Sequence, residues 1–423
     1  MIKIVDHIKA SEYALYLRRP ESQQADIENK VREIIERVEH GGDEALRALC
    51  LEFDGKVPEP FEIPRVMLQR ASSDVDDHLK SAIRQAGENI RAFHQAQLPA
   101  NAVIEPMPGI RCEIRYMPVE RVGLYIPGGT APLLSTVLMT AIPATLAGCS
   151  EIIACTPPGA SPELLYTLGL FNIRVFAIGG AQAIAAMALR TESVPRVDKI
   201  FGPGNAWVTA AKMHFAGRGL AIDMPAGPSE LMVIADRTAK PSYVAADLLS
   251  QAEHGPDSQV VLVSDSMELI QQSIRETEKQ LMLLPRKKTA RASLQHALAI
   301  CVNNLEQATE ISNFYAPEHL ILSVQDPGET ARKITSAGSV FLGNYTPESA
   351  GDYASGTNHT LPTGGAARAW SGITTASFMK SITFQEITRD GLFRLAPTVL
   401  QLARAEQLEA HANALLQRIN ENK

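Results

Sequence analysis

The sequence predicts an α/β protein built on two parallel sheets, with smaller helical segments at the two ends of the chain. Three observations point to this fold class. From Val122 onward, short apolar runs alternate with helical patterns, which is typical of parallel sheets covered by helices. The alternation occurs twice along the chain. With 423 residues, the chain is also too long for one ordinary core, so two or more domains are expected.

Each series of apolar runs predicts one sheet. The first series predicts strands at 122–126, 151–155, 175–178, 199–201 and 231–234, with helices at 133–147, 181–189 and 206–214. The second series predicts strands at 259–263, 297–302, 319–324 and 339–342. No sequence period relates the two series. The expected α/β domains are therefore residues 120–232 and 233–370.

The two ends of the chain are predicted to be helical. Apolar residues from Ile27 to Val38 recur at helical spacing before Gly41-Gly42, and residues 106–109 have the composition of a turn. We expect residues 1–105 to form a helical region packed with the second α/β domain. Residues 371–423 should form a polar helical tail whose last helix spans 398–419. Such a thin tail is typical of a segment that docks on another subunit.

Composition and charge exclude several classes of protein. The net charge of −7 argues against a nucleic-acid partner, and no apolar run is long enough to span a membrane. The first residues lack the pattern of a signal peptide, so we expect a cytoplasmic enzyme. The five cysteines include no C-x-x-C pair, which argues against a thiolate zinc cluster. Cys149 and Cys155 flank a predicted strand, where inert packing is the expected role.

Three glycine loops follow predicted strands in the first series. They are Pro127-Gly128-Gly129, Gly179-Gly180-Ala181-Gln182 and Gly202-Pro203-Gly204-Asn205. Glycine lets backbone N–H groups approach a phosphate at the start of a helix. Any one of these loops is more often a plain turn, and none is a complete G-x-G-x-x-G motif. Together they favour a dinucleotide or phosphate ligand without identifying NAD.

Metal-binding and acid–base residue types gather in the second half of the chain. Gln251 and His254 share one helix face, and Asp352 and His411 would complete a nitrogen and oxygen ligand set suited to Zn²⁺. The spacing does not prove that these residues meet, and single histidines near helix ends are usually surface groups. Glu318-His319 offers two proton acceptors before a strand, although a solvated pair there is equally compatible with the pattern.

Seven segments together resemble the histidinol dehydrogenase family over nearly the whole chain. Matches of this length and order are far more specific than any single loop. The segments are residues 120–130 (ERVGLYIPGGT), 179–184 (GGAQAI), 199–208 (KIFGPGNAWV), 223–230 (DMPAGPSE), 248–259 (LLSQAEHGPDSQ), 315–320 (YAPEHL) and 347–359 (PESAGDYASGTNH).

The resemblance implies two incomplete Rossmann-like domains in an intertwined homodimer with shared active sites. It implies oxidation of L-histidinol to L-histidine through L-histidinal, with two NAD⁺ and one zinc ion per subunit. His319 would be the general base for the alcohol, and Glu318 would activate water. The zinc ligands would be Gln251, His254, Asp352 and His411. The substrate contacts would be Ser229, Gln251, His254, His319, Asp352, Glu406 and His411, and the NAD contacts Tyr125, Gln182 and Asn205.

Three alternatives remain open at this stage. A related enzyme on the same scaffold would oxidise another polar alcohol. A zinc hydrolase would use Glu318 as the base toward an amide or ester, but the three glycine loops would then have no role. A non-catalytic binding protein would tolerate replacement of both Glu318 and His319.

Overall fold

The structure is a computed structural model that describes residues 2–19, 24–128, 133–224 and 227–420. The chain divides into two compact units, Met1–Gln97 with Val119–Phe378, and Leu98–Pro118 with Met379–Lys423. Among the described residues, no helix is both long enough and apolar enough to cross a membrane.

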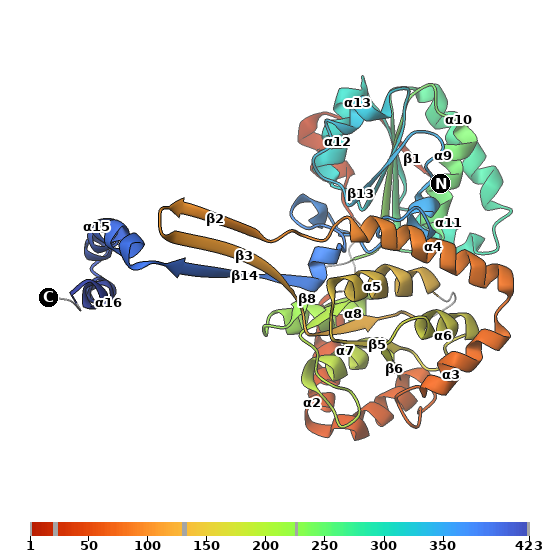
Figure 1. Ribbon diagram of the computed structural model, residues 1–423. Coiled ribbons are helices and arrows are strands. Elements are labelled where there is room, and N and C mark those ends of the chain that lie inside the picture. The colour runs from red at the N-terminus through yellow and green to blue at the C-terminus, as the bar shows by residue number, and fades with distance from the viewer. Residues whose placement is uncertain (1, 20–23, 129–132, 225–226, 421–423) are drawn as a thin grey trace. The chain divides into compact units, whose positions relative to one another are not determined.

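A five-stranded parallel sheet with the strand order β6-β5-β4-β7-β8 lies in the first unit (Figure 1). Its strands are β4 (Arg121–Tyr125), β5 (Glu151–Thr156), β6 (Arg174–Ala177), β7 (Lys199–Phe201) and β8 (Ala221–Ile222). The helices between them are α5 (Leu134–Ala147), α6 (Pro162–Gly169), α7 (Gly180–Leu189) and α8 (Ala206–Ala216). Apolar runs predicted the first four strands, and these are confirmed. The strand β8 is too short to produce such a run.

A six-stranded parallel sheet with the order β1-β11-β10-β9-β12-β13 lies in the same unit. Its strands are β1 (Lys3–Asp6), β9 (Glu230–Ala235), β10 (Gln259–Ser264), β11 (Leu298–Cys301), β12 (His319–Ser323) and β13 (Ser339–Leu342). Its helices are α9 (Pro241–Ala252), α10 (Met267–Leu281), α11 (Lys287–Ser293), α12 (Leu305–Tyr315), α13 (Pro327–Ala331) and α14 (Glu348–Tyr353). The assignment of residues 231–234 to the first series is wrong, because β9 pairs with β10 and β12. An apolar run shows that a strand exists but not which strands it pairs with.

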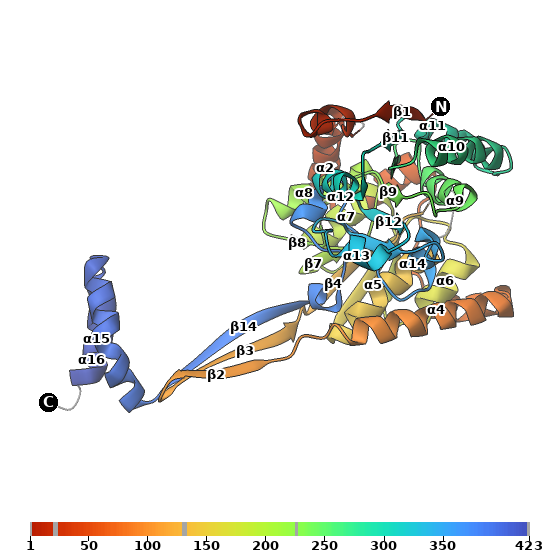
Figure 2. The same cartoon turned by 90° about the horizontal axis from the view of Figure 1, so that it is seen from above.

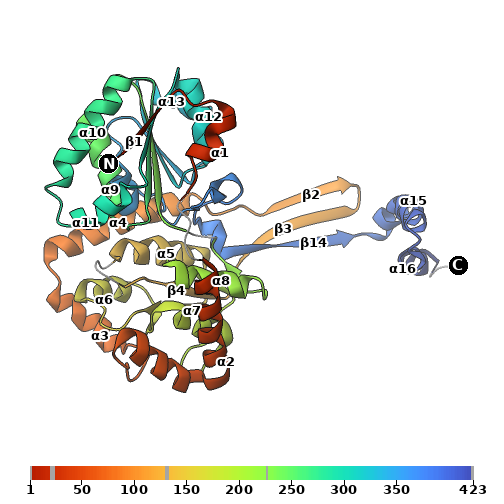
Figure 3. The ribbon, with the colours of Figure 1, turned by 180° about the vertical axis from the view of Figure 1, so that it is seen from behind.

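Alternating side chains of the six-stranded sheet enter two separate cores. On one face, Leu231 and Val233 pack with residues of α9, α10 and α11. On the other face, Met232 and Ile234 pack with residues of α12 and of the short helix α1 (Tyr13–Tyr16). Figures 2 and 3 show the sheet between these two layers of helices. Because both faces are covered, its strands are almost continuously apolar.

The expected helical region over residues 1–105 is divided between the two sheets. The strand β1 joins the six-stranded sheet, whereas α2 (Gln24–Asp54) packs on α7 and α8, and α4 (Asp77–Gln95) packs on α5. The shorter helix α3 (Arg65–Arg70) packs on α6. The expected packing on the second α/β domain is therefore not seen for α2, whereas α4 also contacts that domain, since Asn89 Nδ2 donates to the carbonyl oxygen of Ala354 at 2.8 Å. The period of an amphipathic helix reveals its apolar face but not its partner.

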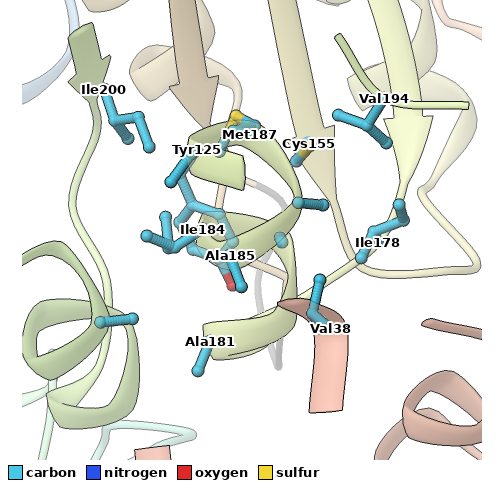
Figure 4. Close-up of a cluster of buried hydrophobic side chains, with 14 of the residues drawn as sticks. Val38, Tyr125, Cys155, Ile178, Ala181, Ile184, Ala185, Met187, Val194 and Ile200 are labelled. Atoms are coloured by element: carbon cyan, nitrogen blue, oxygen red, sulfur yellow. The ribbon is translucent and has the colours of Figure 1, made fainter. Parts of the chain in front are cut away.

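The helix α2 contributes to a buried cluster with α7 and the first sheet. Val38 of α2 lies with Ile184 and Met187 of α7, and with Tyr125 and Cys155 from the strands (Figure 4). The glycine pair Gly41-Gly42 predicts a helix stop, and the structure has a kink there, since Gly42 has a non-helical backbone with φ of 50°. The helix resumes directly after the kink.

The second unit is an antiparallel ribbon with two helices. The ribbon has the order β14-β3-β2, made of β14 (Met379–Ile387), β3 (Ile110–Pro118) and β2 (Ala102–Met107). The helices α15 (Arg389–Ala405) and α16 (Glu409–Asn420) pack on each other. The expectation of a wholly helical tail is thus wrong for β14. The helix expected at 398–419 is also interrupted, because Gln407 has a positive φ of 58°.

A buried ion pair supports the loop that follows β7. Lys212 of α8 and Asp223 form this pair with side chains only 4% and 1% exposed. Lys212 Nζ donates to the carbonyl oxygen of Gly202 at 2.9 Å, and Asp223 Oδ2 accepts from the Gly202 N–H at 2.8 Å. The pair therefore fixes both backbone polar groups of Gly202.

Replacing Lys212 with methionine should leave the Asp223 carboxylate buried without its counter-charge. We expect Lys212→Met to lower the free energy of unfolding by about 3–5 kcal/mol, measured by urea denaturation. The control is Lys279→Met, which removes an exposed pair with Glu276 and should cost less than about 1 kcal/mol. Equal losses in the two variants would contradict a structural role for the buried pair.

Candidate active site

A corner before β12 places Glu318 and His319 at the amino end of a central strand. Ala316 ends α12 in the left-handed conformation with φ of 53°, and Pro317 follows, so the chain turns at once from helix to strand. The strands β12 and β9 pair with His319 opposite Leu231. This register brings Glu230, the first residue of β9, next to Glu318 and His319.

The backbone of Glu230 holds both side chains. Its N–H donates to Oε2 of Glu318 at 2.8 Å, and its carbonyl oxygen lies 3.3 Å from Nδ1 of His319. A carbonyl oxygen only accepts, so Nδ1 of His319 carries the proton of this hydrogen bond. The neutral imidazole then has an unprotonated Nε2, and this buried atom has no hydrogen-bond partner in the described part of the chain. Nε2 is therefore placed to accept a proton from a ligand.

Burial shifts the protonation of both groups in opposite directions. Glu318 is 6% exposed and His319 is 3% exposed. Burial raises the pKa of Glu318 well above its ordinary value, and the nearby carboxylates of Glu230 and Asp352 add to the rise against the opposing Glu230 N–H. Burial lowers the pKa of His319 to about 3. The pair thus offers a neutral imidazole and a more basic carboxylate than usual, which suits proton transfer in two stages.

Two carboxylates of α14 approach the same imidazole. Glu348 and Asp352 stand one helical turn apart after Pro347. Glu348 Oε1 lies 3.4 Å from Nδ1 of His319, and Asp352 Oδ1 lies 3.6 Å from Nε2. One ligand atom of each of the three residues lies within 4.8 Å of the other two. Glu348 is not among the residues predicted from the sequence, although its i, i+4 spacing to Asp352 is an available signal.

The end of α9 adds an amide and a second imidazole. Gln251 Nε2 lies 3.1 Å from Nδ1 of His254, as their spacing on one helix face predicted. Gln251 is fully buried, and its Oε1 has no hydrogen-bond partner among the described residues, like Oε1 of Glu348. Each such atom costs about 1–3 kcal/mol when it stays unpaired, and a bound ligand removes that cost. An amide oxygen, an imidazole and a carboxylate with its pKa raised by burial to about 7 (Asp352) fit a divalent ion such as Zn²⁺.

A cavity of about 1070 Å³ lies between the carboxyl edge of the first sheet and the amino edge of the second. Asn205, which follows β7 and caps α8, lines it on one side. Ser229 and His254 line it on the other side, next to Glu230. The winding of the first sheet reverses between β4 and β7, and ligands of open α/β sheets bind at such points.

The other two predicted cofactor contacts do not line this cavity. Tyr125 and Gln182 are buried, and the Tyr125 hydroxyl accepts a hydrogen bond from the Gly180 N–H at 3.0 Å. Gly202, with φ of 118°, lies so close to Tyr125 that a Cβ would stand 2.1 Å from its carbonyl oxygen. Tyr125 therefore contacts the loops at Gly180 and Gly202 and supports them from the side that does not line the cavity. The remaining predicted loop is Pro127-Gly128-Gly129, and its Gly129 lies outside the described residues.

Two predicted site residues belong to the second unit. Glu406 ends α15, His411 lies in α16, and both are exposed. The structure thus gathers Gln251, His254, Glu318, His319 and Asp352 within the first unit.

The cysteines near the first sheet do not resemble nucleophiles. Cys155 is fully buried, and burial raises the pKa of its thiol. Burial also raises the pKa of Cys149 to about 11. A nucleophilic cysteine needs a lowered pKa, so both observations agree with the packing role expected from the sequence.

Comparison with known proteins gives consistent matches over nearly the whole chain. A family model described as histidinol dehydrogenase matches residues 17–419. The histidinol dehydrogenase of Aliivibrio fischeri is 51% identical over 97% of this chain and 94% of its own length. That of Haemophilus influenzae is 50% identical over 98% of each chain. A putative histidine biosynthesis bifunctional protein of Photorhabdus laumondii is also 51% identical, and this chain spans 51% of its length.

A solved structure agrees with the sequence matches. The crystal structure of histidinol dehydrogenase from Elizabethkingia anophelis has a TM-score of 0.96 and 46% sequence identity, covering 99% of this chain and 98% of that one. The mixed α/β fold with parallel sheets is thereby confirmed.

The shifted pKa of His319 predicts a pH dependence of stability. Because folding lowers this pKa from 6.5 to about 3, the unfolded chain binds the extra proton between these values, and stability falls on acidification. From about pH 7.5 to about pH 5, His319 should account for a loss of about 2 kcal/mol, since one pKa unit corresponds to about 1.4 kcal/mol. Urea unfolding at both pH values should show a smaller loss for His319→Asn. The same substitution at the exposed His78 is the control and should leave the loss unchanged.

Proposed function

Since the chain belongs to the histidinol dehydrogenase family of oxidoreductases, we propose that it oxidises L-histidinol to L-histidine through L-histidinal. Two NAD⁺ accept the two hydrides. The observation that carries this proposal is the placement of Glu318 and His319 on the backbone of Glu230 at the edge of a large cavity. Membership of an oxidoreductase family also sets aside the zinc hydrolase and the non-catalytic binding protein.

His319 and Glu318 take different protons in this reaction. In the first oxidation, Nε2 of His319 accepts the hydroxyl proton as a hydride leaves the carbinol carbon for NAD⁺. Water then adds to the aldehyde while Glu318 accepts its proton, and the hydrated aldehyde loses the second hydride. The unpaired Nε2 and the raised pKa of Glu318 support this division. No thiol is needed, which agrees with the raised pKa of Cys149.

One zinc ion per subunit would be held by Gln251, His254 and Asp352 together with His411. When bound, it orients the substrate and polarises its polar groups. The Oε1 of Gln251 supports this ligand set, because it has no hydrogen-bond partner among the residues that the structure describes. His319 also lies within reach of a metal at Asp352, but its use as a ligand would remove the unprotonated nitrogen that the chemistry requires.

The substrate and the cofactor would share the cavity. NAD⁺ would lie along Asn205 at the start of α8, where helix N–H groups favour phosphate, with Tyr125 and Gln182 shaping the adjacent loops. Histidinol would lie toward Ser229 and the catalytic pair. The full set of proposed substrate contacts is Ser229, Gln251, His254, His319, Asp352, Glu406 and His411.

A homodimer would bring Glu406 and His411 of one chain to the site of the other. The second unit exposes large apolar side chains on its ribbon and helices, and exposed patches of this kind are typical of protein interfaces. They are Val103, Ile104, Met107, Met117, Ile382, Phe384, Ile387, Phe393, Leu402 and Leu408. A second copy of the chain is the proposed occupant of this surface.

The reaction predicts a fixed product ratio and metal content. Purified protein should contain about one zinc per chain and form two NADH for each histidinol consumed, because both hydrides pass to NAD⁺.

Glu318→Gln and His319→Asn should each lower turnover by about 10²-fold or more, the usual effect of losing a general acid or base. Absence of NADH formation from histidinol in the wild-type protein would contradict the proposal.

The shared site predicts recovery of activity when two inactive chains are mixed. His411→Ala damages the site to which its tail contributes, and His319→Asn damages the site in its own first unit. A mixed dimer should have one intact site and regain part of the wild-type turnover, measured after subunit exchange has been verified by mass. Mixing two preparations of His319→Asn is the control. No recovery in verified mixed dimers would count against the exchanged tail.

A further inference from the structure

The side chain of Glu230 is tied down by an arginine that the sequence analysis did not single out. Arg19 Nη2 donates to Oε2 of Glu230 at 2.9 Å, and its Nε donates to Oε1. Arg19 Nη2 also donates to the carbonyl oxygen of Tyr315 at 2.8 Å, and the guanidinium stands 4.0 Å from the centre of the Tyr315 ring. Two parallel N–H donors to one carboxylate fix its direction as well as its distance.

This contact joins parts of the chain that lie far apart in sequence. Gly364 N–H donates to Oε1 of Glu230 at 3.0 Å, and Gly365 leaves little room, since a Cβ there would stand 3.2 Å from Arg19 Nη1. The Tyr315 hydroxyl donates to Oε1 of Gln259 at 2.8 Å. The Glu230 carboxylate is thus held from the N-terminal segment and from the loop before Gly365, at the amino edge of the second sheet.

Stability alone does not account for a charged pair at this place. The Glu230 side chain is 4% exposed, and apolar residues of similar volume often stabilise such sites as well as ion pairs do. What distinguishes Glu230 is its backbone, which donates to Glu318 at 2.8 Å and faces His319 at 3.3 Å. These two groups belong to the peptide units on either side of the Glu230 Cα, so a shift of the Glu230 backbone moves both proton acceptors together.

We propose that Arg19 is a positioning residue that, by clamping the Glu230 carboxylate, holds the Glu230 backbone where it aligns Glu318 and His319. This inference rests on the proposed function of the two residues. Arg19 itself transfers no proton. Glu318 depends on the Glu230 N–H more than His319 depends on the carbonyl, because His319 is also approached by Glu348 and Asp352. Loss of the Arg19 contact should therefore lower the rate of aldehyde oxidation more than the rate of alcohol oxidation.

The test compares Arg19→Met with wild type, using L-histidinol and L-histidinal as separate substrates. We expect kcat for histidinal to fall by about 10- to 100-fold, since a displacement of about 1 Å can cost 10²-fold. The loss for the alcohol step should be smaller, and KM for both substrates should stay within about threefold of wild type. Aldehyde should also accumulate during histidinol turnover, detected with a carbonyl-trapping reagent.

Arg174→Met is the matched control. Arg174 also makes a bidentate contact, to Glu62 at 3.0 and 2.7 Å, and lies 5.2 Å from the Phe176 ring, but it does not line the cavity. The Arg174→Met variant should keep wild-type kinetics in both oxidation steps. If Arg19→Met does not fold, Glu230→Gln keeps the backbone and the size of the side chain and should show the same selective loss.

Three results would overturn the inference. They are wild-type kcat for histidinal in folded Arg19→Met or in Glu230→Gln, an equal loss in both oxidation steps, and a change confined to KM. If the wild-type protein oxidises histidinol but the variants behave like it, only the role of Arg19 fails. If the wild-type protein does not oxidise histidinol, the proposed function itself fails.

Discussion

The parallel pairing of β9 with β12 is the constraint on which the candidate site depends. It sets Glu230 beside Glu318 and His319, so the backbone N–H and C=O of a single residue contact both groups. A shift of this register by one residue would turn every side chain of β12 to the opposite face. The register is fixed because both faces of the sheet are packed with apolar side chains, among them Met232 on one face and Val233 on the other.

The same edge of the sheet concentrates acidic groups in a dry environment. Glu318, Glu348 and Asp352 are buried or nearly so, and burial raises the pKa of each. A cluster of this kind is unfavourable as an array of charges but favourable around a cation. The Oε1 atoms of Gln251 and Glu348, which have no hydrogen-bond partner in the described ranges of the chain, fit that account. The buried carboxylates and the buried amide of the site are therefore best explained as ligands for a cation.

Sequence reasoning found the elements of the sheets but not all of their partners. Strands such as β10 and β12 are continuous apolar runs, so their positions were predictable, whereas exposed β14 has no such run. Gln251 and His254 were predictable from helical spacing. Arg19 was not, because its contact with Glu230 spans 211 residues and depends on tertiary structure. Tyr125 lies behind its loop rather than in the cavity, since a sequence motif does not show which side of a loop a side chain occupies.

The buried thiols have a consequence for oxidative chemistry. Peroxide and alkylating agents react with accessible thiolates. Cys50 and Cys155 are fully buried, and burial raises the pKa of each thiol, so neither side chain is accessible and neither is readily ionised. In the proposed reaction, aldehyde oxidation through a carboxylate and water would place no sulfur at the reacting carbon. Under the proposed mechanism, the site would remain chemically intact under oxidant stress that inactivates a thiolate-dependent enzyme.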